Sequence, residues 1–212
     1  MPFPLSDLPA VQRLALAYAP KTARRPTLAL LALDARLGFI LRRKGEPVLR
    51  QMRLAWWRER LVAEPATWPA GEAVLELLAD WREPAALTAL VDGWEALLGE
   101  RLDPAAIEQF AHGRAVAFAQ LARQVRTDPA SVAQSARLWA LGDLAANLSD
   151  SGERAMVVGC AKGLAPGPLP RDLRPLAVLA GLARRSLACG GAPLLDGSRA
   201  ALTAIRLGIT GR

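Results

Sequence analysis

Long runs of strong helix formers, with no strand-like alternation, are the feature that most constrains the fold of this chain. Ala, Leu and Arg dominate the 212 residues, and β-branched residues nowhere alternate with polar ones over the length of a strand. Hydrophobic residues make up 52% of the sequence and charged residues 22%, which is typical of a globular chain. No internal repeat or linker divides the sequence. We therefore expect one all-α domain over residues 1–212.

Helix-capping and helix-breaking residues place the main elements. Gly45 separates two apolar stretches that we expect to form helices over residues 28–44 and 46–63, packed antiparallel. Asp103-Pro104 combines an N-cap with a proline at the first helical position, and it predicts a helix to about residue 125. Asp128-Pro129 repeats this signal, and it predicts a helix to about residue 150.

A formal net charge of +7 favours an anionic partner. Phosphates, acidic lipid head groups and acidic proteins all fit. The basic residues are scattered in ones and twos without a concentrated stripe, so we expect no nucleic acid among the partners.

Cys160 and Cys189 are the only cysteines, and His112 is the only histidine, so a histidine-based metal site is not expected. We predict that both cysteines are reduced core thiols in a cytoplasmic protein. The N-terminus lacks the pattern of a signal peptide, and the most apolar runs contain charges, so we predict no transmembrane helix.

The segment MRLAWWRERL, residues 52–61, carries the most information about a binding site. At 100° per residue its apolar side chains form two strips, one of Leu49, Met52 and Trp56 and one of Leu54, Trp57 and Leu61. Arg53 and Arg60 fall between the strips. Two arginines within an apolar face must meet an anion or reach water, because an unpaired buried charge is costly. The alternatives are a diphosphate or acidic ligand and an ion pair with a neighbouring helix.

Asp34 interrupts the apolar run LALLALDARLGFIL and shares a helix face with leucines. A carboxylate at that position requires a partner. We predict that Asp34 is buried and paired with Arg53 or Arg60, with a metal site as the alternative.

Asp143, Asn147 and Asp150 lie at i, i+4 and i+7 in the segment DLAANLSD. Oxygen ligands on one helical face at this spacing are able to hold Mg²⁺ beside a phosphate. The alternative is a solvated polar face.

The run from Leu28 to Leu61 resembles the region of squalene/phytoene synthases in which a Glu-Pro pair precedes an Arg-Leu-x-Trp-Trp-Arg segment. Residues 102–123 and 169–187 look like later helices of the same family. The resemblance implies a shortened helical bundle of the isoprenoid (prenyl/terpenoid) synthase type around a central cavity.

Enzymes of this family join two prenyl diphosphates head to head, using two aspartate-rich motifs that hold Mg²⁺ against the diphosphates. In this chain the first acidic cluster is replaced by residues 36–40, RLGFI, with Asp34 nearby. In the second motif Asp150 matches one aspartate, but the position four residues later is Arg154. The chain therefore looks similar to a divergent branch that includes a respiratory complex I assembly factor.

The resemblance and the lost aspartates lead to two main hypotheses. The first is a non-catalytic assembly, scaffold or lipid-binding protein near a membrane, without a cofactor. Its partners are a lipid or prenyl-diphosphate-like ligand, an anionic membrane surface or a protein. The second is an active prenyltransferase of isoprenoid biosynthesis with an atypical Mg²⁺ site drawn from Asp34, Asp143 and Asp150.

A helical bundle unrelated to prenyl chemistry is a third hypothesis. Convergence of the three aspartates on one cavity at ligand distance favours the enzyme, whereas pairing with arginines favours the first hypothesis.

Overall fold

Every regular element of the computed structural model, which describes residues 3–43 and 45–211, is helical, so the all-α prediction is confirmed for these residues. The α-helices are α1 (Ala10–Ala17), α2 (Lys21–Arg42), α3 (Pro47–Val62), α4 (Ala73–Leu78), α5 (Thr88–Ala96), α6 (Pro104–Gln124), α7 (Ala133–Asn147), α8 (Ser151–Cys160), α9 (Arg174–Ala188) and α10 (Gly197–Thr210). Short 3-10 turns lie between some of them, at Leu5–Asp7, Pro65–Thr67, Pro84–Leu87, Pro129–Val132 and Arg171–Leu173.

The two Asp-Pro signals both start helical structure, although in different ways. Asp103 caps α6, its Oδ1 accepting a hydrogen bond from the backbone N–H of Ala106 at 2.8 Å. Asp128 likewise accepts from the backbone N–H of Ala130 at 2.9 Å, but it opens a 3-10 turn, and α7 begins only at Ala133.

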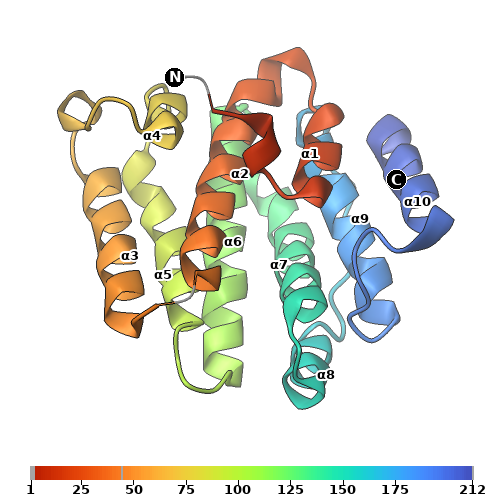
Figure 1. The fold of residues 1–212 in the computed structure, drawn as a ribbon. Helices are drawn as coiled ribbons and strands as arrows, with labels where there is room; N and C mark the ends of the chain where they lie inside the picture. Colours follow the sequence, from red (N-terminus) through yellow and green to blue (C-terminus); the bar gives the residue numbers. More distant parts are fainter. Residues whose placement is uncertain (1–2, 44, 212) are drawn as a thin grey trace.

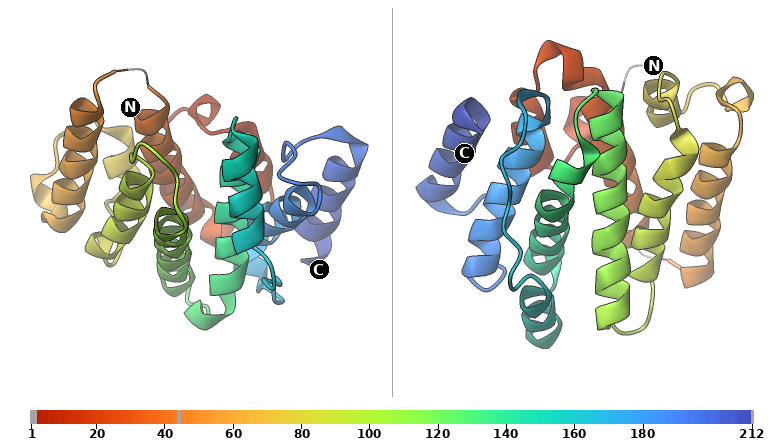
Figure 2. Two further views of the ribbon diagram at one scale, coloured as in Figure 1. Left: turned by 90° about the horizontal axis from the view of Figure 1, so that it is seen from below. Right: turned by 180° about the vertical axis from the view of Figure 1, so that it is seen from behind.

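The helices form a row with a second layer packed on one face. Successive contacts join α3, α5, α6, α7, α9 and α10 in that order, while α2 lies on one face of the row against α5 and α6, and α1 packs on α9 (Figure 1). The views from below and from behind show the same order, with α2 and α6 on opposite faces (Figure 2). One continuous core cluster extends from Leu8 to Leu207.

Small residues allow the helices of the row to approach closely. A Cβ added to Gly113 of α6 would lie 2.3 Å from the carbonyl oxygen of Ala89 in α5. A Cβ on Gly142 of α7 would lie 2.4 Å from the Cβ of Ala183 on α9. Since interiors are close-packed, larger side chains at these positions would force the helices apart.

α2 and α3 run in opposite directions and contact each other, as predicted (Figure 1). α2 starts at Lys21, seven residues before the predicted start, and includes Pro26 within the helix. Its predicted end, residue 44, lies outside the described residues. The helix predicted to run to about residue 150 ends at Asn147, and a separate helix, α8, follows it.

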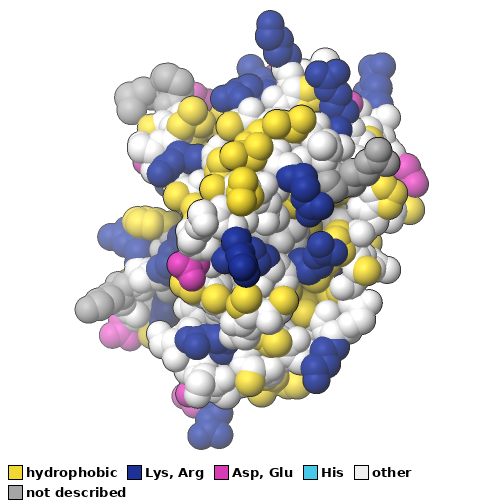
Figure 3. All heavy atoms as spheres, turned by 90° about the vertical axis from the view of Figure 1, so that its right-hand side faces the viewer, with side chains coloured by type: hydrophobic (Ala, Val, Ile, Leu, Met, Phe, Trp, Pro, Cys, Tyr) yellow, Lys and Arg dark blue, Asp and Glu magenta, His cyan; other side chains and the backbone are white. Residues whose placement is uncertain are grey.

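α3 and α10 lie at the two ends of the row, so each packs through one side and exposes apolar side chains on the other. On α10 the exposed strip consists of Leu202, Ile205 and Ile209. Figure 3 shows this edge of the molecule, where basic side chains stand apart among apolar ones and acidic side chains are few.

Within residues 3–43 and 45–211, none of the helices combines the length and the apolar character needed to cross a bilayer. The prediction that both cysteines lie in the core is wrong. Cys160 ends α8, Cys189 follows the last residue of α9, and both are free and exposed.

Candidate functional site

A buried arginine between two carboxylates forms the centre of the bundle. Arg114 of α6 holds Asp34 of α2 by two parallel hydrogen bonds, from Nε to Oδ1 at 3.0 Å and from Nη2 to Oδ2 at 2.9 Å. The same Nη2 lies 2.8 Å from Oδ2 of Asp143 on α7. The side chains of Arg114 and Asp34 are 2% and 6% exposed, and that of Asp143 is 18% exposed. Both carboxylates are thus bound to one cation.

Two further donors complete the coordination of Asp34. Trp94 Nε1 donates to Oδ1 at 2.9 Å, and Gln12 Nε2 donates to Oδ2 at 3.0 Å. We call these five residues, Gln12, Asp34, Trp94, Arg114 and Asp143, the central cluster. They come from α1, α2, α5, α6 and α7, so the cluster connects five helices.

Aromatic rings surround the guanidinium of Arg114. Its central carbon lies 4.6 Å from the ring centroid of Phe110, 5.0 Å from that of Trp139 and 5.1 Å from that of Trp94. Such ring faces attract a desolvated cation. Nη1 of Arg114 has no hydrogen-bond partner among the described residues, so ring contacts support the part of the charge that the carboxylates do not reach.

Burial and charge act on the pKa values of the cluster in opposite directions. Burial by itself lowers the pKa of Arg114, but the charges of Asp34 and Asp143 outweigh it and hold the pKa above its usual value. Loss of hydration raises the pKa of Asp143, against the attraction of Arg114 and with the repulsion of Asp34. Arg114 therefore stays charged. The charged form of Asp143 is less favourable in the folded protein than it is in water.

The prediction that Asp34 is buried is confirmed, but its predicted pairing with Arg53 or Arg60 is wrong. Asp34 faces the inside of the bundle towards α6, whereas α3 lies at its edge. The partner is Arg114, and the sequence contains a pattern that indicates its burial but was not used above. Arg114 interrupts the apolar stretch FAHGRAVAFAQL, residues 110–121, just as Asp34 interrupts its own.

The predicted face of Asp143, Asn147 and Asp150 does not exist as one surface. Asn147 donates from Nδ2 to the carbonyl oxygen of Asp143 at 2.8 Å, so these two do lie together. α7 ends at Asn147, however, and Asp150 caps α8 by accepting from the backbone N–H of Glu153 at 2.8 Å. Arg154 donates to the carbonyl oxygen of Leu148 at 2.7 Å and pairs with no aspartate among the described residues.

On α3 only one of the two predicted apolar strips is buried. Leu54, Trp57 and Leu61 enter the core, whereas Leu49, Met52 and Trp56 are 51%, 63% and 37% exposed. The reason is that α3 ends the row and has neighbours on one side only.

Arg53 and Arg60 therefore reach water rather than an interior anion. Arg53 is exposed, and Arg60 is half-buried with Glu59 of its own helix at 3.9 Å. The ion pair to a neighbouring helix is made instead by Arg58, which binds Asp92 and Glu95 of α5 and whose pKa these hydrogen bonds raise.

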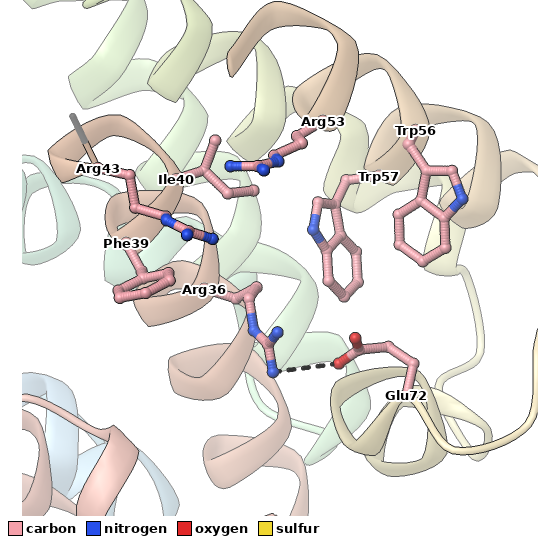
Figure 4. Close-up of a pocket in the computed structure, with 8 residues that line it drawn as sticks. All are labelled: Arg36, Phe39, Ile40, Arg43, Arg53, Trp56, Trp57 and Glu72. Atoms are coloured by element: carbon pink, nitrogen blue, oxygen red, sulfur yellow. Dashed lines mark ion pairs between the residues drawn. The ribbon is translucent and has the colours of Figure 1, made fainter. Parts of the chain in front are cut away.

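A groove between α2 and α3 brings three arginines together, Arg36, Arg43 and Arg53. It has a volume of about 210 Å³, and we call it the α2–α3 groove (Figure 4). Its walls are formed by Arg36, Phe39, Ile40 and Arg43 of α2, Arg53, Trp56 and Trp57 of α3, and Glu72, the N-cap of α4.

Charge in the groove is unbalanced. Arg36 pairs with Glu72, Nη2 to Oε1 at 3.3 Å. Arg43 and Arg53 have no ion-pair partner among the described residues, and Figure 4 shows them extending into the space from opposite walls. Arg43 also lies over the ring of Phe39, at 5.6 Å from its centroid.

The groove and the central cluster lie at two ends of a series of hollows along α2. A hollow bordered by Arg36, Phe39 and Arg42 adjoins the groove, and a larger one of about 420 Å³ includes Arg42, Asp34 and Asp143. Asp34 and Asp143 thus converge on one cavity, as the enzyme hypothesis requires, but they do so around Arg114. Asp150 does not border that cavity.

The carboxylate oxygens of the central cluster are not arranged to coordinate Mg²⁺. Both oxygens of Asp34 already accept two hydrogen bonds each, and a buried cation lies between the two carboxylates. No group of three His, Cys, Asp or Glu side chains among residues 3–43 and 45–211 is arranged to hold a metal.

Comparison with known proteins returned no matching protein-family model, no matching curated protein and no matching solved structure.

Proposed function

We propose that this protein is a non-catalytic helical bundle of the squalene/phytoene synthase type that binds anionic lipid at a membrane surface. The observation that carries the non-catalytic part is the position of Arg114 between Asp34 and Asp143. In a prenyl synthase, carboxylates facing one another across a cavity are needed to hold metal ions against a departing diphosphate. Here the facing carboxylates hold an arginine and fasten helices together.

Replacing the arginine by a metal would be costly. Mg²⁺ would have to displace a cation that makes two hydrogen bonds to Asp34 and contacts three aromatic rings. The displaced guanidinium would remain buried without a partner, which is among the most unfavourable states for a charged group. The cost of displacing Arg114 therefore favours a non-catalytic protein over an atypical prenyltransferase.

The lipid part of the proposal comes from the charges outside the cluster. The chain carries a formal net charge of +7, and the α2–α3 groove has arginines without carboxylate partners beside exposed apolar side chains. Each Lys or Arg close to an anionic bilayer contributes about 1 kcal/mol of binding free energy. A protein of this kind is suited to rest on a membrane and to assist assembly there.

Two assays on the purified chain test the proposal. The first incubates it with farnesyl and geranylgeranyl diphosphate plus Mg²⁺ and measures pyrophosphate release, and we expect none. The second floats it with vesicles of phosphatidylcholine alone and of phosphatidylcholine with phosphatidylglycerol, and we expect binding to the anionic vesicles. Metal-dependent pyrophosphate release would restore the prenyltransferase hypothesis. Failure to bind either vesicle would leave a protein partner as the basis of a scaffold role.

A further inference from the structure

The α2–α3 groove has the charge of a site for a phosphate group. Three guanidinium groups, those of Arg36, Arg43 and Arg53, face one carboxylate, and that carboxylate is taken by Arg36. Two positive charges on opposite walls therefore lack a counter-ion among the described residues. Arginine is well suited to phosphate, because its planar fork donates two hydrogen bonds to one oxyanion.

Apolar side chains border this basic groove and point to solvent. Met52 is 63% exposed, Phe39 is 53% exposed, and Trp56, which lines the groove next to Trp57, is 37% exposed (Figure 4). Val48 and Leu49 continue the strip along α3. Exposed aromatic and aliphatic side chains in contact with arginines are typical of surfaces that enter the head-group layer of a bilayer.

The shape of the surface favours a bilayer over a folded protein as the occupant. The exposed apolar side chains project from α3 and from the end of α2, whereas the concave part between the helices combines three guanidinium groups with the apolar side chains of Ile40 and Trp57. A groove of about 210 Å³ accommodates a head group but is too small to receive a helix. A fluid surface accepts projecting side chains without needing a complementary pocket.

We infer that the α2–α3 groove is the membrane-binding site, in which Arg43 and Arg53 hold the phosphate of an anionic phospholipid while Phe39, Met52 and Trp56 enter the interface. This inference rests on the proposed function, since it names the surface and the lipid group that the binding uses. The opposite edge serves as a natural control, because α10 also exposes an apolar strip beside Arg199 and Arg206. That strip contains no aromatic side chain.

The experiment measures partition of the full chain onto vesicles with and without phosphatidylglycerol for four variants. Two alter the groove, Arg43→Gln/Arg53→Gln and Met52→Ser/Trp56→Ser. Two make matched changes on α10, Arg199→Gln/Arg206→Gln and Leu202→Ser/Ile205→Ser. Each arginine pair removes the same net charge, and all eight side chains are exposed, so the circular dichroism should match that of the parent. The ring of Trp56 packs edge-on against that of the buried Trp57, with 5.2 Å between the centroids, so only the variant with Trp56→Ser is expected to unfold at a lower temperature.

We expect the Arg43→Gln/Arg53→Gln variant to bind anionic vesicles about 30-fold more weakly, since two membrane-facing charges are lost. The Met52→Ser/Trp56→Ser variant should lose binding by about tenfold or more, whereas both α10 variants should stay within about twofold of the parent. Equal binding of the groove variants and the parent, or an equal loss in the α10 variants, would overturn the inference while leaving the proposed function intact. A parent chain that binds neither vesicle overturns both, and one that binds neutral and anionic vesicles alike overturns the role of the phosphate.

Discussion

Arg114 and Arg53 show how one residue type serves opposite purposes in the same bundle. Arg114 lies on the central helix α6, is almost fully buried and is shared by two carboxylates. Arg53 lies on the edge helix α3, is exposed and has no ion-pair partner among the described residues. The central cluster contains more negative than positive charge, and the α2–α3 groove contains more positive than negative charge.

The difference in burial decides what each site is able to do. At the centre, desolvation makes an unmatched charge so unfavourable that each charged side chain must have an oppositely charged partner within the protein. The cluster is therefore occupied by its own residues and holds five helices together. At the edge, water supports an unmatched arginine, and that arginine remains available for an external anion. A binding function is thus more readily assigned to the α2–α3 groove, whose arginines lack partners, than to the central cluster, whose charges are paired.

The variant Arg114→Leu gives the strongest test of the difference between the buried and the exposed arginine. Removing the cation leaves Asp34 and Asp143 buried opposite each other, and we expect the unfolding free energy to fall by about 3–5 kcal/mol. The matched change at the edge, Arg53→Leu, should alter it by less than about 0.5 kcal/mol. Urea unfolding followed by circular dichroism measures both. Similar losses in the two variants would show that burial does not separate the sites.

A second test compares the two carboxylates within the cluster. Asp34 accepts four hydrogen bonds and is 6% exposed, whereas Asp143 contacts Arg114 through one oxygen and is 18% exposed. We expect Asp34→Asn to cost about 3 kcal/mol and Asp143→Asn about 1 kcal/mol, because an asparagine keeps only one acceptor oxygen and Asp34 accepts more hydrogen bonds than Asp143. If Asp143→Asn proved the more harmful, Asp143 rather than Asp34 would be the main anchor of Arg114.

The sequence predicted the helical class and several helix starts, because these depend on residues close together in the chain. The N-cap of α6 at Asp103 is of this kind. So is the burial of Asp34, which follows from the leucines around it. The identity of its partner does not follow, since Arg114 lies 80 residues away and only packing brings the two together. The apolar interruption at Arg114 was an available signal, but α3 contained a more conspicuous pair of arginines.

The errors on α3 and α7 have two different physical causes. The sequence showed two apolar strips on α3 but not which of them is buried, because the number of neighbouring helices decides how much of a helix is covered, and a single sequence does not contain that number. On α7 the cause was local. Asp150 is followed three residues later by Glu153, a pattern that favours the start of a new helix, and α8 begins there. The candidate groove itself requires the spacing of α2 and α3 and was not predictable.

The pH dependence of stability offers a smaller and more specific test of the cluster. The pKa of Asp143 is raised above its usual 3.8 by loss of hydration, so the folded state holds this proton more tightly than the unfolded state. The stability that Asp143 contributes relative to Asp143→Asn should therefore be greatest below pH 3.8 and decline as pH rises through the raised pKa. Urea titrations of both proteins at several pH values measure this difference. An advantage that grows with pH would mean that attraction by Arg114 outweighs burial.

The smallest effect is expected at a third arginine, whose environment lies between the other two. Arg137 of α7 binds Glu108 of α6 through both guanidinium nitrogens, with Nη1 to Oε1 at 2.7 Å, and its side chain is 25% exposed while that of Glu108 is 60% exposed. Water screens such a pair, so we expect Glu108→Gln to cost only about 0.5 kcal/mol at pH 7 despite the two-pronged geometry.

The hydrogen bonds from Arg137 lower the pKa of Glu108 below its usual 4.5. A carboxylate with a depressed pKa stabilises the folded state above its usual pKa and loses that contribution as pH falls through the depressed value. The difference between the parent and Glu108→Gln should therefore vanish in acid, opposite in direction to the change expected for Asp143. Unfolding temperatures of the two proteins between pH 3 and pH 7 measure it. A loss at Glu108 as large as that at Arg114 would mean that geometry, rather than burial, sets the value of an arginine pair, and the contrast between the central cluster and the α2–α3 groove would then need another explanation.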